Sequence, residues 1–420
     1  MLDIKFIRDN LEEVRSGLLK RLPAEKLDLE GLLALDEKRR RLIQELEELK
    51  AQRNRFSKTK PTPEVIEKMK TVGEEIKRLE AELDESQSAL ETSLSELPNI
   101  PAADVVAGDK ENNEVIHVSG SVPSFDFPPQ DHVALATSLG IIDYERAAKM
   151  SGSGFWCYRG LGAQLEWALL SYFINFHTKN GYTFLIPPFL LTEKSAYTSG
   201  HLPKFRDDLF WTQDKLCLNA TSEMMLGNYH REEILPEEDL PLRYFAYSPC
   251  FRREAGSYRQ EERGMVRGHQ FNKVEMFIFS HPEKSWEMFA ELTRQAQKLL
   301  EGLGLHFQVS KLAAADCSAA MAKTYDLEVY IPSMGIYKEV SSVSNALDYQ
   351  ARRGQIRFRN SASGKNELVH TLNASGLATS RLLPAILEQN QQADGSVLIP
   401  KALRDYLPKR QKVIKLEKKK

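Results

Sequence analysis

Two runs of apolar residues at heptad spacing constrain the N-terminal quarter of the chain more than any other feature. The first run places an apolar residue at every seventh position: Leu35, Leu42, Leu49 and Phe56. The second run steps by three and four residues from Met69 to Leu97. This spacing is typical of long helices that pack along a shared apolar seam. Because KPTP at residues 60–63 separates the runs, we predict a long antiparallel helical hairpin.

This predicted hairpin has two interpretations. It is either a dimerisation or interaction coiled coil, or an arm that reaches a partner. Basic side chains near its tip would suit a phosphate backbone, although a charged face is usually only a solvated face: Arg53, Arg55, Lys58 and Lys60. Prolines at 98 and 101 end the pattern, so we predict an N-terminal domain at 1–101 and a polar linker at 102–119.

Charge and cysteine usage exclude several classes of protein. The formal net charge is -2, so any basic surface for nucleic acid must be local. The cysteines at 157, 217, 250 and 317 form no CxxC pair and lack histidines at zinc-ligand spacing, so we expect no zinc and a reducing compartment. No apolar run reaches the length of about 18 residues that spans a membrane, and the N-terminus is unlike a targeting peptide. We therefore predict a cytoplasmic protein with no membrane partner.

Residues 120–408 mix helical and strand patterns and form the second predicted domain, before a basic tail at 409–420. A helical pattern covers 165–176, and Gly181 follows it. The next strand pattern contains Pro187 and Pro188, which favour a sheet edge because proline cannot donate to a ladder. Later strands come in hairpins, which predicts an α+β fold with a mainly antiparallel sheet.

The stretch FRREAGSYRQEERGMVRGHQFNKVEMF, residues 251–277, reads as two charged strands around a long turn. Alternation puts Phe271, Lys273 and Glu275 on one face of the second strand. Arg252 can clamp a phosphate, Phe271 can stack a purine, and Glu275 can pair a substrate ammonium. The alternative is a surface hairpin whose charges neutralise each other across the strands.

Two shorter segments also combine hydroxyls with carboxylates. In NATSEMML, Thr221 and Glu223 suit a small amino acid, but they also fit a helix-capping box. In KEVSSVSN, Glu339 and its serine neighbours supply oxygen ligands of the kind that suit Mg²⁺. Simple alternation puts Glu339 and Ser342 on opposite faces, so a shared ion requires a bulge. The alternative there is an edge strand with solvated serines.

A third segment, NASGLATSRLL, offers Ser375 at a helix start and Arg381 inside that helix. A helix N-terminus favours anions, and Arg381 would add a fixed positive charge. Ordinary helix capping explains the same residues. Pro384 falls inside this predicted helix, where it should cause a kink. The chain has neither GxGxxG nor GxxxxGK[ST], so a nucleotide must be held in another way.

Taken in order, these segments resemble class II aminoacyl-tRNA synthetases. GAQLEWAL…GYTFLIPPFLL resembles motif 1, FRREAG…RGHQFNKVEMF motif 2, and ASGLATSRLLPAILEQNQ…LRDYL motif 3. With TSE, KEVSSVSN, SGHLPKF and the helical arm, the chain resembles the bacterial-type seryl-tRNA synthetase family over nearly its whole length. The resemblance implies an antiparallel sheet with flanking helices, a homodimer formed through motif 1, and an arm that binds tRNA(Ser).

The resemblance also implies a reaction and its residues. L-Serine attacks ATP to give seryl-adenylate, and the seryl group passes to the 3' end of tRNA(Ser). Serine binding is implied for Thr221, Glu223, Arg252, Glu275 and Ser375. ATP binding is implied for Arg252, Glu254, Phe271, Glu339, Val340, Ser341, Ser342 and Arg381. Arg252 and Arg381 would be the catalytic residues, and Glu339 and Ser342 would hold Mg²⁺.

Two features depart from the family pattern. The motif 2 loop reads SYRQEERGMVRG where DTRG is common, and Pro384 interrupts motif 3. The loop would meet the tRNA acceptor end, so altered behaviour is expected in the transfer step. Three alternatives stay open: a ligase that loads serine onto another acceptor, an inhibitor-resistant second copy of the synthetase, and a non-enzymatic RNA-binding paralogue.

Overall fold

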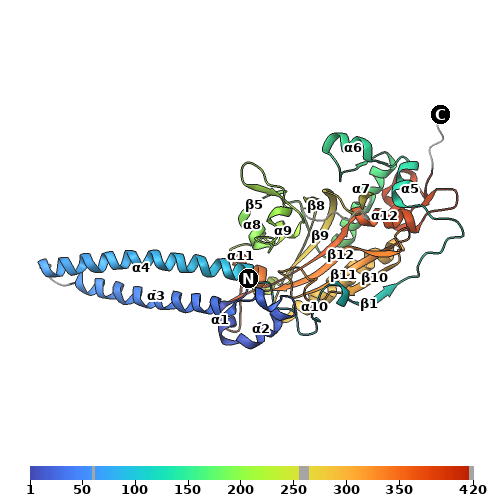
Figure 1. Ribbon diagram of the computed structural model, residues 1–420. Coiled ribbons are helices and arrows are strands. Elements are labelled where there is room, and N and C mark those ends of the chain that lie inside the picture. Colours follow the sequence, from blue (N-terminus) through green and yellow to red (C-terminus); the bar gives the residue numbers. More distant parts are fainter. Residues whose placement is uncertain (59–61, 255–263, 416–420) are drawn as a thin grey trace. The chain divides into compact units, whose positions relative to one another are not determined.

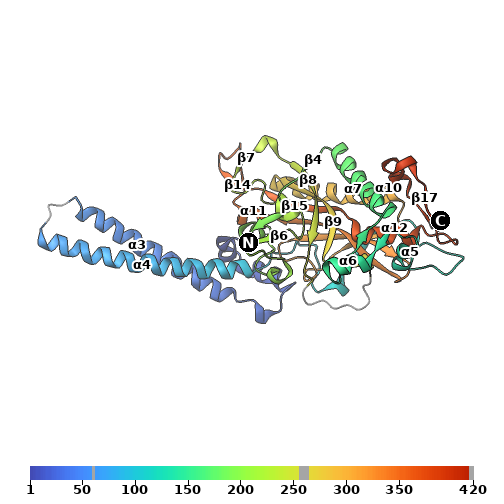
Figure 2. The ribbon, with the colours of Figure 1, turned by 90° about the horizontal axis from the view of Figure 1, so that it is seen from above.

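The computed structural model describes residues 1–58, 62–254 and 264–415, in two compact units, Met1–Ile100 and Pro101–Lys420. The first unit contains helices α1 (Ile4–Asp9), α2 (Leu11–Leu19), α3 (Leu29–Phe56) and α4 (Pro63–Glu96). Helices α3 and α4 lie side by side in both views (Figures 1 and 2). The predicted helical hairpin is confirmed, and Lys60 at its tip lies outside the described residues.

The apolar seam of the hairpin is the one that the heptads predicted. Its buried residues pack against one another between the two helices: Leu42, Leu46, Val72, Ile76 and Leu79. The side chain of Thr62 caps α4 by accepting a hydrogen bond from the Val65 amide. At the opposite end, Asp36 of α3 is fully buried and accepts a 2.8 Å hydrogen bond from Arg8 of α1.

The second unit is built on an eight-stranded sheet in the order β1-β10-β11-β12-β15-β9-β8-β4. Its strands are β1 (Glu114–Ser119), β4 (Thr183–Leu185), β8 (Leu242–Phe251), β9 (Gln270–Ser280), β10 (Phe307–Lys311), β11 (Lys323–Ile331), β12 (Ile336–Leu347) and β15 (His370–Ala378). All neighbouring strands are antiparallel except β4 and β8. The predicted α+β fold is confirmed, and the two prolines do follow an edge strand, β4.

One prediction about this unit needs correction. Residues 114–119, which we placed in a linker, form strand β1 and pair with β10. Their sequence EVIHVS is rich in β-branched residues, which suit a strand. The Asp and Asn residues upstream of this short strand dominated the composition of the segment and concealed it.

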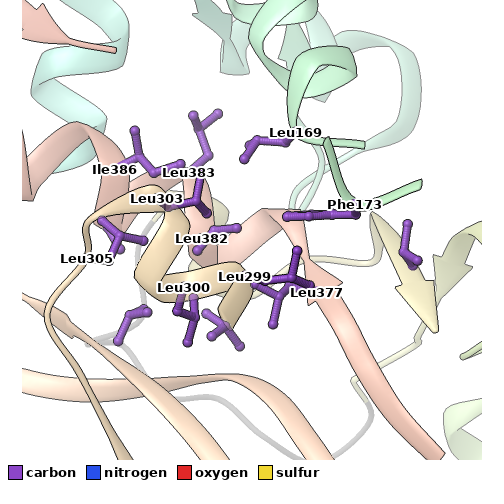
Figure 3. Close-up of a cluster of buried hydrophobic side chains, with 14 of the residues drawn as sticks. Leu169, Phe173, Leu299, Leu300, Leu303, Leu305, Leu377, Leu382, Leu383 and Ile386 are labelled. Atoms are coloured by element: carbon purple, nitrogen blue, oxygen red, sulfur yellow. The ribbon is translucent and has the colours of Figure 1, made fainter. Parts of the chain in front are cut away.

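Three helices cover the sheet and enclose its core: α7 (Leu161–Lys179), α10 (Ser285–Leu303) and α12 (Thr379–Gln389). Figure 3 shows where they meet, with Leu169 and Phe173 of α7 near Leu299 of α10 and Leu383 of α12. Helix α12 continues through Pro384 to Gln389, so the proline does not end it. No described helix has both the length and the apolar character needed to cross a membrane.

The remaining elements are short and surround this core. The helices are α5 (His132–Ser138), α6 (Tyr144–Ser151), α8 (Glu193–Thr198), α9 (Glu223–Leu226) and α11 (Tyr349–Gly354). The strands are β2 (Ile142–Asp143), β3 (Cys157–Tyr158), β5 (Leu190–Thr192), β6 (Leu216–Leu218), β7 (Ile234–Pro236), β13 (Arg357–Arg359), β14 (Asn366–Leu368), β16 (Val397–Leu398) and β17 (Val413–Ile414). Short 3-10 turns complete the chain; one of them, at Gly264–Val266, precedes β9.

Candidate active site

A cavity of about 410 Å³ in the second unit brings together residues from two helices, three strands and the loops and short turns beside them. All the site residues predicted from the sequence line it except Ser341: Thr221, Glu223, Arg252, Glu254, Phe271, Glu275, Glu339, Val340, Ser342, Ser375 and Arg381. Residues separated by up to 160 positions therefore meet in one place. No single motif showed that these residues meet; the tertiary structure brings them together.

Strand β9 supplies one wall of the cavity, because alternate side chains along a strand point to the same face. Phe271, Lys273 and Glu275 face the cavity, whereas Val274 and Met276 belong to the apolar core on the other side. The guanidinium of Arg252 lies 5.3 Å from the centre of the Phe271 ring. Arg252 and Phe271, which the sequence placed on the two strands of one hairpin, are therefore in cation–π contact within the cavity.

Part of the cavity lining is an acidic pocket around Glu275 and Glu223. The Glu275 carboxylate accepts hydrogen bonds from Asn373 at 3.1 Å and from the Ser375 hydroxyl at 3.2 Å. The ammonium of Lys273 lies 2.6 Å from Glu275 and donates to the Thr221 hydroxyl at 2.6 Å. Two carboxylates, two hydroxyls and a cation thus surround a space suited to a small zwitterion.

Glu223 is the second carboxylate of this pocket. Gln350 donates to it at 2.7 Å, and only 8% of the residue is exposed. Burial, followed by the negative charge of Glu275, raises the pKa of Glu223 to about 7. The capping alternative is not found, because Ser222 is the N-cap of α9 and its side chain makes no capping hydrogen bond. The Thr221 hydroxyl, one residue earlier, accepts a hydrogen bond from the Glu223 amide at 3.3 Å.

Arg381 and Glu339 form a second charged group in the lining of the cavity. Arg381 donates to the Val266 carbonyl at 3.2 Å and to the Glu339 carboxylate at 3.2 Å. Burial alone would raise the pKa of Glu339, but the charges of Arg381 and Arg252 outweigh it and hold the pKa below its ordinary value. Glu339 therefore stays ionised beside two arginines.

The bulge that a shared ion required is present in β12. Glu339 pairs with Glu328 and Ser341 pairs with Leu327, so Val340 is an extra residue without its own partner. This extra residue lets both Glu339 and Ser342 line the cavity. Ser341 points elsewhere: it is fully buried, and its hydroxyl donates to the Ser375 carbonyl at 2.6 Å. Ser341 is thus not part of the cavity lining, and its hydrogen bond supports the strand that carries Ser375. Its predicted part in ATP binding stays a prediction.

Comparison with known proteins agrees with this geometry in both units. The model for the seryl-tRNA synthetase N-terminal domain matches residues 1–101, and the model for the tRNA synthetase class II core domain (G, H, P, S and T) matches 205–390. Serine–tRNA ligase 2 of Clostridium acetobutylicum is 52% identical over 97% of this chain and 99% of its own length. The chain belongs to the seryl-tRNA synthetase family.

Other members of the seryl-tRNA synthetase family support the same assignment. Serine–tRNA ligase of Exiguobacterium sibiricum is 46% identical over 97% of this chain and 98% of its own. The crystal structure of seryl-tRNA synthetase from Pyrococcus horikoshii complexed with ATP has a TM-score of 0.94 and 35% identity, covering all of both chains. The resemblance seen in the motifs is thus confirmed for the family and for the class II fold.

The structure adds residues to this synthetase site that the sequence did not single out. Lys273 shares a strand face with Phe271 and Glu275, so alternation alone was sufficient to find it. Asn373 and Gln350 carry no such signal, because only tertiary packing brings them to Glu275 and Glu223. A β-carbon at Gly376, next to Ser375, would lie 2.3 Å from the buried His177 ring of α7. Glycine is required there for the strand to approach the helix.

The unusual motif 2 loop is described only at its ends. Glu254, at the first end, forms an ion pair with Arg267, close to the second end. Residues 255–263, which carry most of the departure from the family pattern, lie outside the described residues. Its predicted effect on the transfer step stays a prediction.

Proposed function

We propose that this serine–tRNA ligase binds L-serine in the acidic pocket and ATP along the arginine-lined remainder of the same cavity. One observation carries the proposal: Glu223 and Glu275 line the same cavity as Arg252 and Arg381. A zwitterionic amino acid and a polyphosphate need opposite charges, and the cavity offers both. The charge of Arg252 acts on both Glu223 and Glu339, so Arg252 suits the place where the serine carboxylate meets a phosphate.

The roles in the acidic pocket follow from which groups are already paired. Lys273 neutralises Glu275, so the Glu223 carboxylate is the better partner for the substrate ammonium. The Glu275 carboxylate then accepts a hydrogen bond from the substrate hydroxyl, and the Ser375 hydroxyl donates one to it. A pocket that hydrogen-bonds a hydroxyl rejects alanine, because alanine leaves buried polar groups without partners. Thr221 borders the same space and limits its width.

The roles in the proposed ATP site follow from charge and shape. Phe271 stacks on adenine, Arg252 binds the α-phosphate, and Arg381 binds the terminal phosphate. Glu254, Val340 and Ser342 complete the lining. The serine carboxylate attacks the α-phosphorus and pyrophosphate leaves; the 3'-terminal hydroxyl of tRNA then attacks the seryl carbonyl and AMP leaves. Catalysis comes from alignment and charge neutralisation by the arginines, without a protein nucleophile.

Glu339 and Ser342 have a donor type and a placement that suit a magnesium ion. Both are oxygen donors, and the bulge at Val340 turns both to the cavity. The described residues contain no cluster of three or more metal-binding side chains, so these two would share the ion with phosphate oxygens and water. Bound there, Mg²⁺ would supply neutralisation of phosphate charge.

We also propose the partners and location expected for this activity. The exposed Arg53, Arg55 and Lys58 near the end of α3 suit the backbone of tRNA(Ser). Trp167 on α7 is 57% exposed and Ile186 after β4 is 72% exposed, which suits a homodimer formed through this motif 1 segment. All four cysteines are free, in keeping with the reducing cytoplasm.

Serine-dependent exchange between ATP and pyrophosphate tests the activation step. Serine, alanine, threonine and cysteine are compared first, and total tRNA is then charged with the preferred amino acid. Exchange and charging with serine alone support the proposal. Exchange without tRNA charging would instead favour a ligase that loads serine onto another acceptor. The absence of exchange with every amino acid would refute the enzymatic assignment.

A further inference from the structure

A buried carboxylate behind the sheet joins the segments that carry motifs 1, 2 and 3. Glu166 of α7 is only 3% exposed. One of its oxygens accepts hydrogen bonds from the Asn272 side chain of β9 at 2.8 Å and from the Thr379 hydroxyl of α12 at 2.6 Å. The Thr379 hydroxyl also lies 3.1 Å from the Asn272 carbonyl. A single carboxylate oxygen therefore connects a helix, a strand and the start of a second helix.

Both partners of Glu166 are adjacent to residues that we assign to ATP. Asn272 lies between Phe271 and Lys273, and alternation turns it away from the cavity. Thr379 is the first residue of α12, and Arg381 follows in the same helical turn. The carboxylate thus fixes the backbone from which the adenine-facing ring and the phosphate-facing guanidinium extend. Neither contact involves the substrate itself.

Burial of the Glu166 carboxyl group costs free energy of desolvation, so a functional role is needed to explain it. Its neighbours on α7, Leu165 and Leu169, belong to the apolar core, and an apolar residue would avoid the desolvation of a carboxyl group. Burial raises the pKa of Glu166 to about 7, although hydrogen bonds from Thr379 and Asn272 lower it. The N-terminus of α12, next to the carboxylate, favours its negative charge. Buried carboxylates of this kind are weak contributors to stability, so another role accounts better for its presence.

We propose that Glu166 is a positioning residue for ATP: it aligns β9 with the first turn of α12 so that Phe271 and Arg381 bind one nucleotide. The inference rests on the proposed function and deepens it. It assigns Glu166 an effect on ATP rather than on serine. Among the residues proposed for serine, Thr221 and Glu223 lie in the α9 segment rather than on β9 or α12. Lys273 is next to Asn272, but its own ion pair with Glu275 and its hydrogen bond to Thr221 hold it in place.

Three substitutions separate positioning from general stability. Glu166→Leu removes the acceptor and should raise the ATP KM in serine-dependent exchange at least tenfold. Thr379→Val is nearly isosteric, removes one hydrogen bond and should raise the ATP KM about fivefold. Glu166→Gln keeps a carbonyl oxygen that can accept both bonds, so its kcat/KM should stay within about threefold of the parent. The serine Kd, measured calorimetrically without ATP, should change less than twofold in all three.

Glu388→Leu is the matched control. Glu388 is also fully buried and also makes several hydrogen bonds, to His132 and Ser333, but it lies at the far end of α12 and does not line the cavity. It should lower the melting temperature without moving the ATP KM more than twofold. Equal effects of Glu388→Leu and Glu166→Leu on the ATP KM would overturn the inference. So would equal loss of serine and ATP affinity in Glu166→Leu, or failure of Glu166→Gln to restore ATP binding.

The two proposals can fail separately. Calorimetric binding of a non-hydrolysable ATP analogue to the parent and to each variant needs no turnover. If the parent shows no exchange but binds the analogue, weaker binding in Glu166→Leu and Thr379→Val still supports positioning. Unchanged analogue binding in both variants refutes it, whether or not the parent is active.

Discussion

The ammonium of Lys273 and the carboxylate of Glu275 lie 2.6 Å apart on the cavity face of β9, and both residues are almost fully buried. The same ammonium donates to Thr221 at 2.6 Å. The cation therefore orders two groups of the acidic pocket that we propose for serine and offsets one of its two negative charges. Without it, Glu223 and Glu275 would repel each other in a site that excludes water.

Lys273→Met should weaken serine binding and stability together. Breaking a buried ion pair by removing one partner costs about 3–5 kcal/mol, because the other charge is left uncompensated. We expect the serine KM in exchange assays to rise at least tenfold and the melting temperature to fall. Lys323→Met is the control, since Lys323 is also a buried lysine in an ion pair, with Asp104, but lies outside the cavity. An unchanged serine KM in Lys273→Met would contradict this role.

The serine KM should fall as the pH rises through about 7, the pKa of Glu223. Only the ionised carboxylate pairs with a substrate ammonium. The ionised fraction rises about tenfold between about pH 6 and 8, so a KM change of up to about tenfold is expected. A pH profile of exchange measures it, and Glu223→Gln should show a higher serine KM without this pH dependence.

The same group makes stability depend on pH in the opposite sense. The folded pKa of about 7 is raised above the ordinary 4.5, so the folded protein binds the extra proton between these values. The contribution of Glu223 to the free energy of unfolding therefore falls as the pH rises through that window and is constant above it. Denaturant titrations of the parent and of Glu223→Gln would show a shallower decline in the variant. Equal slopes would mean that Glu223 titrates normally.

The adjacent serines of β12 should have different phenotypes. Ser342→Ala removes a cavity-facing hydroxyl, so we expect a several-fold higher Mg²⁺ concentration for half-maximal exchange. Ser341→Ala instead removes the hydroxyl that holds the Ser375 carbonyl, so we expect a higher serine KM and an unchanged Mg²⁺ requirement. Each variant is the control for the other. Identical Mg²⁺ titrations for both would remove Ser342 from the proposed metal site.

The helical hairpin should serve tRNA charging and not serine activation. Leu42 is 2% exposed in the seam between α3 and α4, so Leu42→Ala should destabilise the hairpin by about 2–5 kcal/mol. We expect slower charging of tRNA(Ser) with unchanged exchange, since every residue of the cavity lies in the second unit. Leu299→Ala, in the core of the second unit, is the control variant. It should lower the temperature at which both serine-dependent exchange and tRNA charging are lost. Loss of exchange in Leu42→Ala would show that the units are not independent.

Local patterns predicted whatever depends on residues close together in the chain. Heptads specify the α3–α4 seam because each helix repeats its own contacts, and alternation specifies the shared face of Phe271, Lys273 and Glu275. The chemical types of the site residues suited an amino acid, a nucleotide and a metal ion, but each segment also fitted ordinary helix capping or surface charge. Family resemblance then connected segments whose order in the chain was the only relation visible between them.

Tertiary structure decided the relations that no local period encodes. The register of β11 against β12 creates the bulge at Val340, which turns Ser342 into the cavity and leaves Ser341 beneath Ser375. Packing between elements far apart in the chain brings Gln350 to Glu223, and Glu166 to Asn272 and Thr379. The physical reason is the same in each case. The repeat of apolar residues along a helix or strand determines only which face of that element a side chain occupies. The partner it meets there depends on how the other elements are packed around it.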